Sequence, residues 1–377
     1  MPLMKYLLLI TVFLVSFRSV AQLENDSLEF RISPDTTRSR ELHLSIYNFN
    51  FLRNYEFFND FQDGYTLFGT QLEPRLTYHV NSRLLISAGV HLRKDFGKDG
   101  INKTIPLFSI KYQKGKTALI NGAIEGNVHH RFIEPVFDFE RKINNPVEYG
   151  TQFLVKKESL FLDAFINWNK MIERNSPEQE QIFAGLSSDI SVYSTQQFKA
   201  SVPLQVFAFH QGGQIDVNPD PLKTIVNSAI GFKLQWLRSG FVSKLKTENY
   251  LVSYKDFSPT KTLMYEGGNA IFLNASAATR FGTLIASYWH GNKYISRVGM
   301  PIYQSVSQQI NHQGYSEEKR QLLFLRYLYQ KQLVQNFYLD FRVEPVIDLK
   351  PSGSKSLEFY HSLFLVYKQD FRLFRRK

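Results

Sequence analysis

The sequence predicts an all-β fold, a transmembrane antiparallel up-and-down β-barrel of about sixteen strands. Three observations support this prediction: apolar and polar residues alternate with period two, the alternating stretches are long, and short turns alternate with longer loops along the chain. The composition agrees with it, because 33 Phe and 20 Tyr accompany only 21% charged residues. Aromatic residues are favoured in strands and in the girdles of membrane barrels.

The alternation is clearest in residues 68–80, where Leu72 and Leu76 fall on one face and Glu73 and Arg75 on the other. We predict strands near residues 41–48, 65–80, 83–94, 103–113, 117–128, 147–157, 159–170, 180–193, 197–210, 224–237, 241–254, 262–278, 281–290, 319–331, 336–348 and 356–370. Most of these stretches reach the ~9–11 residues that a tilted membrane strand needs, whereas strands of soluble proteins average ~5–6.

The connections alternate in length, as expected for a barrel with short periplasmic turns and long outer loops. Short turns fall near residues 81–82, 114–116, 157–158, 194–196, 238–240 and 280, and longer loops near 49–64, 128–146, 171–179, 211–223, 255–261 and 291–318. An even number of strands would leave both termini on the periplasmic side. The stretch 262–290 alternates poorly around Gly267 and Gly268, so fourteen and eighteen strands remain alternatives.

A soluble β-sandwich is the alternative fold, in which the apolar faces would be buried between two sheets. A sheet that crosses a bilayer has to close on itself, because hydrocarbon offers no hydrogen-bond partners to an open edge. If the apolar faces meet lipid, the polar faces line the inside of the barrel.

The N-terminus predicts export. Lys5 precedes an apolar stretch at residues 6–17, and Ser19, Val20 and Ala21 suit cleavage before Gln22. We therefore expect a signal peptide at residues 1–21, a periplasmic N-terminal tail at 22–40 and the barrel at 41–377. The alternative, an uncleaved anchor helix, would be shorter than the ~20 residues of a spanning helix. The absence of Cys excludes disulfides, thiolate metal sites and cysteine nucleophiles.

With these features the mature chain resembles the porin-like outer-membrane β-barrels of Gram-negative bacteria, and the signal ending resembles those of exported Bacteroidota proteins. The resemblance concerns architecture and implies an outer-membrane location, contact with outer-membrane lipid and insertion by the barrel-assembly machinery. The chain departs from the usual terminal aromatic residue, because Arg375, Arg376 and Lys377 follow Phe374. Although the net charge is +11, Lys and Arg are scattered, so we expect no nucleic-acid binding.

The predicted lumen carries charges of both signs, which can either hydrate the wall or form a selective constriction. No stripe of one sign favours strong ion selectivity. We expect the following residues to line the pore: Gln71, Glu73, Arg75, Arg93, Lys111, Glu125, Asp163, Asp189, Arg326, Asp340, Arg342 and Glu344.

The loop at residues 128–146 is predicted to fold against or into the barrel mouth. Its apolar residues, among them Phe132, Phe137 and Phe139, are too numerous for a loop that extends into solvent. Folded inward, it would form a constriction with the residues His129, His130, Glu134, Asp138 and Glu140. Its acids and histidines could hold a metal ion, but their spacing matches no ligand motif. We expect neither a metal nor a cofactor.

A passive or weakly selective pore for small polar solutes is the favoured function, because about sixteen strands leave room for an aqueous channel. The alternatives are a binding or assembly barrel, which holds a partner protein or a surface polysaccharide, and a lipid-active enzyme. His43 and Ser45 are similar to the His-x-Ser placement of outer-membrane phospholipases, but here both should point inward. The sequence therefore favours a protein that is not an enzyme.

Overall fold

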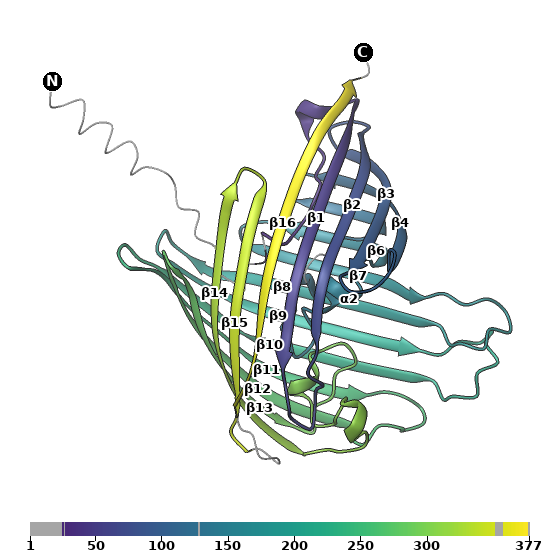
Figure 1. Cartoon of the computed structure of the whole chain (residues 1–377), viewed down its shortest axis with the longest axis vertical. Coiled ribbons are helices and arrows are strands. Elements are labelled where there is room, and N and C mark those ends of the chain that lie inside the picture. Colours follow the sequence, from purple (N-terminus) through teal and green to yellow (C-terminus); the bar gives the residue numbers. More distant parts are fainter. Residues whose placement is uncertain (1–24, 26, 127–128, 351–356, 376–377) are drawn as a thin grey trace.

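The computed structural model describes residues 25, 27–126, 129–350 and 357–375, and it forms a closed barrel of sixteen antiparallel strands (Figure 1). The predicted fold class is confirmed. Each strand pairs with its neighbour in the chain, and β1 closes the barrel on β16. None of the described helices is long and apolar enough to cross a membrane. The expected signal peptide at 1–21 lies outside the described residues.

Each predicted strand corresponds to one strand of the barrel. The strands are β1 (Glu41–Glu56), β2 (Thr66–His79), β3 (Leu84–Asp95), β4 (Lys103–Lys114), β5 (Thr117–Ala123), β6 (Tyr149–Lys156), β7 (Leu160–Lys170), β8 (Gln181–Ser194), β9 (Phe198–Gln211), β10 (Lys223–Leu237), β11 (Val242–Asp256), β12 (Gly267–Thr279), β13 (Gly282–Asn292), β14 (Lys319–Val334), β15 (Phe337–Asp348) and β16 (Leu357–Arg375). Short helical segments occupy the connections: η1 (Thr36–Arg38), η2 (His129–Arg131), α2 (Arg141–Asn144), η3 (Pro301–Tyr303) and η4 (Ile310–His312).

The connections define two different rims. The turns between β2 and β3, β4 and β5, and the following pairs are short, whereas the loops that leave β1, β3, β5 and every second strand after them are longer. We call these the short-turn rim and the long-loop rim. Both the start of β1 and the end of β16 lie at the short-turn rim, because Glu41 pairs with Arg375. In outer-membrane barrels the short-turn rim faces the periplasm.

The alternation of side chains places apolar residues outside and charges inside. In β7, Leu162 and Ile166 face outward, whereas Asp163 is buried within the barrel. In β1, Glu41, His43 and Ser45 face inward, as predicted for His43 and Ser45.

Strand β1 extends eight residues beyond the predicted end at 48. In this second half the usual polarity is reversed. Phe49 and Phe51 point inward and are buried, while Asn50 and Asn54 point outward. A search for strands with apolar outward faces therefore assigns this part of the chain to a loop. Its backbone nevertheless pairs with β16 as far as Glu56 and with β2 as far as Asn54.

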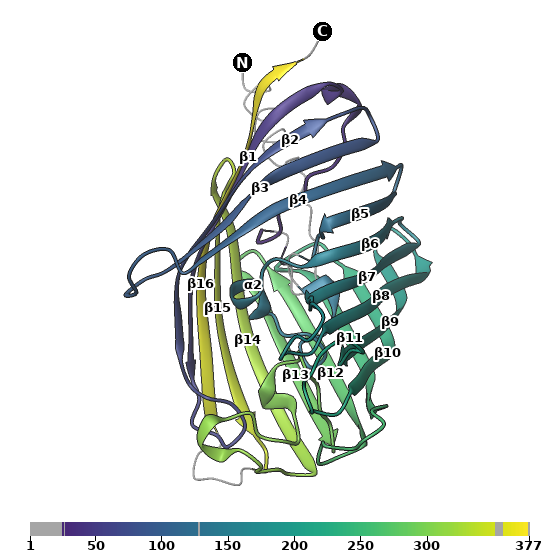
Figure 2. The ribbon, with the colours of Figure 1, turned by 90° about the vertical axis from the view of Figure 1, so that its right-hand side faces the viewer.

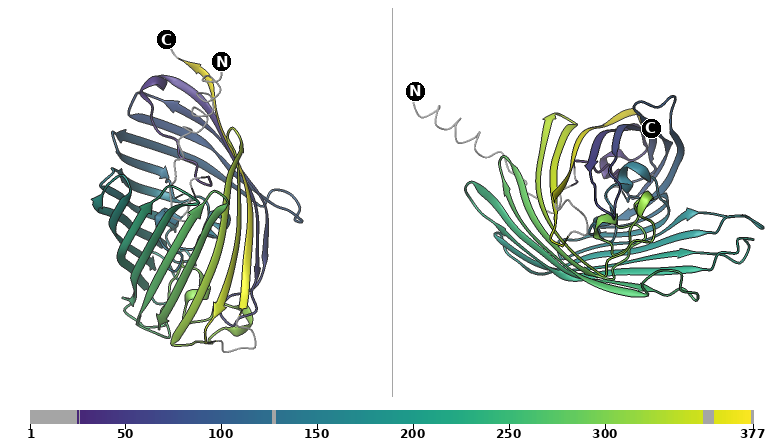
Figure 3. Two further views of the ribbon diagram at one scale, coloured as in Figure 1. Left: turned by 90° about the vertical axis from the view of Figure 1, so that its left-hand side faces the viewer. Right: turned by 60° about the horizontal axis from the view of Figure 1, so that its bottom comes forward.

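The long loop between β5 and β6, residues 124–148, folds into the barrel, as predicted. Phe132, Val136, Phe137 and Ile143 are buried. The loop between β13 and β14, residues 293–318, packs against it, since Asp138 N donates to Val298 O and Met300 N to Glu134 O. Figure 2 and the right-hand view of Figure 3 show α2 and these loop segments within the curve of the wall. We call these two segments the third and seventh long loops.

The described part of the N-terminal segment also lies against the inside of the wall, and its expected place as a periplasmic tail stays a prediction. Leu28 is buried, and the Tyr47 hydroxyl donates to its carbonyl oxygen at 2.7 Å. Asn25 accepts a hydrogen bond from Arg342, and Lys111 donates to Ile32 O. The physical reason is that Leu28 and Phe30 find an apolar surface on the inward rings of β1, where Phe30 stacks on Tyr47.

The orientation of the wall can be tested at Leu162. Replacing it with Arg puts a charge into the hydrocarbon, which should lower the free energy of unfolding by ~2–4 kcal/mol if the site lies near the middle of the bilayer. The measurement is denaturant unfolding in lipid vesicles. Thr260→Arg, in an exposed loop, is the matched control and should change little. Equal stability of the two variants would contradict the orientation.

Candidate functional site

The charged residues predicted to line the lumen do lie inside the barrel wall. Most are buried: Gln71, Glu73, Arg93, Lys111, Asp163, Arg326, Asp340, Arg342 and Glu344. Arg75, Glu125 and Asp189 are partly buried. Instead of facing an open channel, they pair with one another or with the loops that fill the lumen. A role in conduction therefore stays a prediction for each of them.

The third long loop is held by these luminal residues. Arg326 donates to Glu134 Oε2 at 2.5 Å and to the Tyr303 hydroxyl at 2.9 Å. On β2 and β3, which lie four and five strands from β14 around the wall, Gln71 and Arg93 both donate to the carbonyl oxygen of Ile143, each at 2.8 Å. The contact between Glu134 and a basic luminal residue follows from the inward fold that the sequence predicted. The loop is thus fixed to the wall at β14 and at β2 and β3.

His130 anchors the start of the same loop. Its Nδ1 lies 2.9 Å from Asp163 Oδ2 and its Nε2 lies 2.8 Å from Glu148 Oε2, while the ring stacks on Phe165 at 3.8 Å. Burial alone would lower the pKa of His130, but the two carboxylates raise it to about 9. The imidazolium therefore acts as a charged clamp between loop and wall. Of the neighbouring His129, the structure describes only the backbone, within η2.

The other predicted loop acids lie beside residues that the sequence did not single out. The Tyr65 hydroxyl donates to Glu140 Oε2 at 2.6 Å. Burial and the neighbouring Glu140 raise the pKa of Asp138 to about 7. Arg53, which lies close enough to oppose this rise, is buried against the Phe139 ring at 5.1 Å. Arg53 was missed because it belongs to the half of β1 whose polarity is reversed.

Two polar cavities remain between the N-terminal segment and the wall. The larger, of about 530 Å³, lies towards the short-turn rim and is lined by residues that include Arg31, Arg38, Lys368 and Asp370. The smaller, of about 40 Å³, is lined by residues that include Glu73, Arg75, Lys111 and Lys142. A space of this size accommodates only a few waters. Both cavities lie beside the described N-terminal segment, and the lining of each includes charged residues of both signs.

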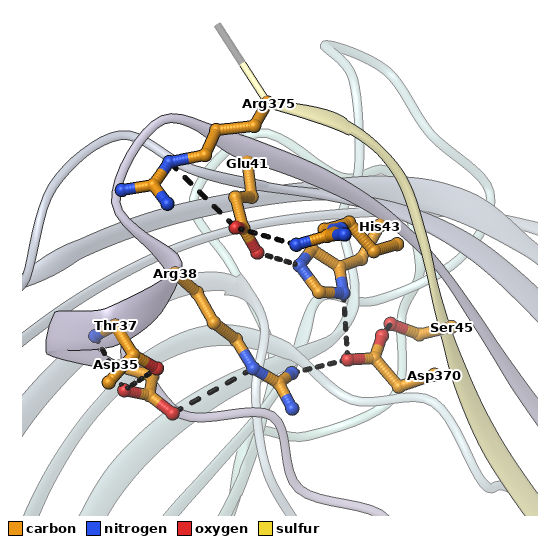
Figure 4. Close-up of polar contacts among 9 residues, drawn as sticks. Asp35, Thr37, Arg38, Glu41, His43, Ser45, Asp370 and Arg375 are labelled. Atoms are coloured by element: carbon orange, nitrogen blue, oxygen red, sulfur yellow. Dashed lines mark hydrogen bonds and ion pairs between the residues drawn. The ribbon is translucent and has the colours of Figure 1, made fainter. Parts of the chain in front are cut away.

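The predicted His43–Ser45 pair does not form a nucleophile and base. Figure 4 shows His43 between Glu41 and Asp370, with its ring nitrogens 2.9 and 3.0 Å from their oxygens. Ser45 donates to Asp370 Oδ1 at 2.7 Å instead of to His43. Both ring nitrogens of His43 face carboxylates instead of Ser45, so His43 is not placed to take a proton from the Ser45 hydroxyl. The site also lies at the short-turn rim, where Arg38 contacts Asp370.

A different histidine pair lies at the long-loop rim. His312, in the seventh long loop, places Nδ1 2.6 Å from Asp60 Oδ1, in the loop between β1 and β2. The His312 side chain is 46% exposed and that of Asp60 is 23% exposed. In contrast, His43, His91 and His130 are buried beside their carboxylates. Sequence reasoning missed this pair because its members belong to loops far apart in the chain.

The loop that carries Asp60, residues 57–65, is fixed on the seventh long loop by three hydrogen bonds. Gln308 N donates to Phe61 O, Ile302 N to Gln62 Oε1, and Ile310 N to Asp63 Oδ2, at 3.0 to 3.2 Å. Phe61 is buried and lies under the guanidinium of Arg320, 3.5 Å from the ring centre. The geometry of the Asp60–His312 pair is therefore set by backbone contacts on both of its sides.

The closed barrel, its apolar outer wall and its two unequal rims define an outer-membrane β-barrel protein. The chain belongs to the family described as Lipid A 3'-O-deacylase-type, whose profile matches residues 33–376. This finding corrects our expectation that the protein is not an enzyme. That expectation rested on the inward His43–Ser45 pair, and a family of this description points to enzymatic activity.

Solved structures match most of this chain at low sequence identity. OccK1 (OpdK) of Pseudomonas aeruginosa has a TM-score of 0.50 at 9% identity, with 88% of this chain and 100% of that chain covered. OprD of Pseudomonas aeruginosa has a TM-score of 0.49 at 11% identity, covering 90% and 99%. OmpT of Vibrio cholerae has a TM-score of 0.49 at 9% identity, covering 87% and 99%. We find no match among curated protein sequences.

The His130 clamp predicts a pH dependence of stability. Because the folded-state pKa is raised from 6.5 to about 9, the stabilisation is fully present below pH 6.5 and is lost as the pH rises through 9. Wild type should lose up to about 3 kcal/mol of unfolding free energy relative to His130→Gln between pH 6.5 and 10. Denaturant unfolding of both proteins across this range measures the difference. His210→Gln is the control and should follow wild type, and parallel profiles of wild type and His130→Gln would refute the clamp.

Proposed function

We propose that this protein hydrolyses an ester-linked acyl chain of an outer-membrane glycolipid, with lipid A as the substrate class. The observation that carries the proposal is the Asp60–His312 pair at the long-loop rim, in a chain of the Lipid A 3'-O-deacylase-type family. Two properties support the choice of this rim. It faces outward in outer-membrane barrels, and its loops lie beside the lipid headgroups of the outer leaflet.

In this mechanism His312 is the general base. Asp60 accepts the hydrogen of Nδ1–H, which fixes the tautomer and leaves the lone pair of Nε2 for a water molecule. His312 removes a proton from that water as its oxygen attacks the ester carbonyl carbon. The tetrahedral intermediate then breaks the bond to the sugar oxygen, which receives the proton from His312. The products are a free fatty acid and a glycolipid with one more hydroxyl group.

The test is deacylation by purified protein in vesicles that contain lipid A, measured by mass spectrometry as the loss of one acyl chain. Removing the general base with His312→Ala should slow the reaction by about 10²- to 10⁴-fold. Asp60→Asn should slow it as well, because the imidazole loses its orientation. Heat-modifiable migration in gels verifies that each variant is folded.

Two control variants test whether the reaction depends on the Asp60–His312 pair and not on residues elsewhere in the barrel. Ser45→Ala and His210→Gln should both deacylate at the wild-type rate, because neither residue touches the Asp60–His312 pair. An inactive Ser45→Ala that is folded would move the reaction to the short-turn rim. A wild-type protein that releases no acyl chain, or a fully active His312→Ala, would refute the proposal.

A gated pore for small polar solutes is the second candidate. The polar cavity of about 530 Å³ at the short-turn rim favours it, because it gives a solute an entrance into the lumen. The third long loop closes the path above. Conduction therefore requires displacement of a loop that Arg326, Gln71 and Arg93 hold in place.

Deleting Phe132–Glu140 tests this second function. The deletion removes the apolar filling together with Glu134, Asp138 and Glu140, so it should raise single-channel conductance and shift ion preference away from cations. Planar-bilayer recording of the refolded protein measures both. Deleting 213–220 from the loop between β9 and β10 is the control and should leave conductance unchanged. If the Phe132–Glu140 deletion conducts no better than wild type, the pore function is excluded.

A further inference from the structure

The two rims differ strongly in exposed charge. On the short-turn rim, six exposed cations lie in the turns or directly beside them: Arg83, Lys114, Lys116, Lys157, Arg238 and Arg280. Among the described residues of these turns, Glu158 is the one exposed carboxylate. Arg40, Arg372 and Arg375 add exposed cations where β1 meets β16, and the last two lie 3.6 and 4.0 Å from Glu41. We call the six turn residues the basic ring.

The long-loop rim shows no such excess. Its described loops and the strand residues directly beside them expose the carboxylates Asp99, Glu173, Glu178, Asp220, Glu266 and Glu318 and the cations Lys98, Arg174, Lys255, Lys261, Arg297, Lys319 and Lys350. These two groups nearly balance. The positive charge of the chain that remains at its surface is therefore concentrated on the short-turn rim, which faces the inner leaflet of the outer membrane.

We propose that the basic ring binds the phosphate groups of anionic phospholipids in this leaflet. Two of its cations lie beside exposed aromatic side chains. The guanidinium of Arg238 lies 4.9 Å from the centre of the Trp236 ring, and that of Arg280 lies 4.6 Å from the centre of the Phe281 ring. Trp236 is exposed near the end of β10, and Phe281 is exposed in the turn after β12. Aromatic girdles mark the headgroup region of the bilayer, so these cations meet phosphate there.

The distribution of the ring favours lipid over a docked protein. Its members belong to the turns after β2, β4, β6, β10 and β12, which are spread around most of the barrel. A single protein partner would cover one arc of the rim, whereas a shell of lipids surrounds all of it. Each Lys or Arg near an anionic surface adds an attraction that salt screens. The charge on the ring and the phosphate of the headgroup are complementary.

The experiment compares the full-length protein in nanodiscs of phosphatidylcholine that contain a small fraction of spin-labelled phosphatidylglycerol or spin-labelled phosphatidylcholine. The fraction of motionally restricted label gives the relative affinity. Wild type should prefer phosphatidylglycerol by about fivefold or more. The variant Lys114→Gln, Lys116→Gln, Arg238→Gln, Arg280→Gln should lose most of this preference. High salt should also weaken the preference of wild type for phosphatidylglycerol, because it screens the attraction between the cations and the phosphate groups.

The control variant carries Lys98→Gln, Arg174→Gln, Lys261→Gln and Arg297→Gln on the long-loop rim and should keep the wild-type preference. Equal binding of the two lipids by wild type at low salt would overturn the proposal. So would a loss of preference in the control variant that equals the loss in the ring variant. If wild type shows no preference for phosphatidylglycerol but binds an added acidic protein that the ring variant does not bind, the basic ring is a site for a protein partner. If the ring variant fails to fold, the salt dependence of wild type decides.

Discussion

The pairing of β1 with β16 is the contact on which the rest of the structure depends. Hydrocarbon cannot satisfy backbone hydrogen bonds, so a sheet in the bilayer is stable only when its two edge strands join. Here the two strands pair along their whole common length, from Glu41 beside Arg375 to Glu56 beside Phe359. Closure in turn fixes which face of each strand meets lipid. It also encloses a wide lumen, which is occupied either by other parts of the chain or by water.

The chain fills this lumen unequally. Towards the long-loop rim, the third and seventh long loops and inward aromatic rings such as Phe165, Phe207 and Trp289 form one apolar cluster. Towards the short-turn rim, polar cavities lie between the N-terminal segment and the wall. Charged groups are tolerated in the filled part because they are paired, as Arg326 is with Glu134 and Glu344. In the closed barrel, inward charges of this kind pair with one another and with the loops.

Much of the fold was predictable because period-two alternation is a local property. All sixteen predicted strands correspond to strands of the barrel, including those around Gly267 and Gly268 where alternation is weak. The exception was the second half of β1, where Phe49 and Phe51 serve the interior and Asn50 faces outward. The inward fold of the third long loop was predictable from its apolar content. The wall residues that contact this loop could not be predicted, because Asp163 and Gln71 do not differ in the sequence from other inward polar residues of a barrel wall.

The candidate site was the least predictable part, for a geometric reason. His43 and Ser45 are neighbours in one strand, so their shared face can be read from the sequence, but their actual partner, Asp370, enters from β16. Asp60 and His312 meet only because both of their loops return over the filled lumen. The seventh long loop, which belongs to the apolar filling, therefore also positions the pair. A barrel with an empty lumen would leave loop 57–65 without the contacts to Gln308 and Ile302 that hold Asp60 in place. Occlusion of the lumen and organisation of the long-loop rim are two consequences of one packing arrangement.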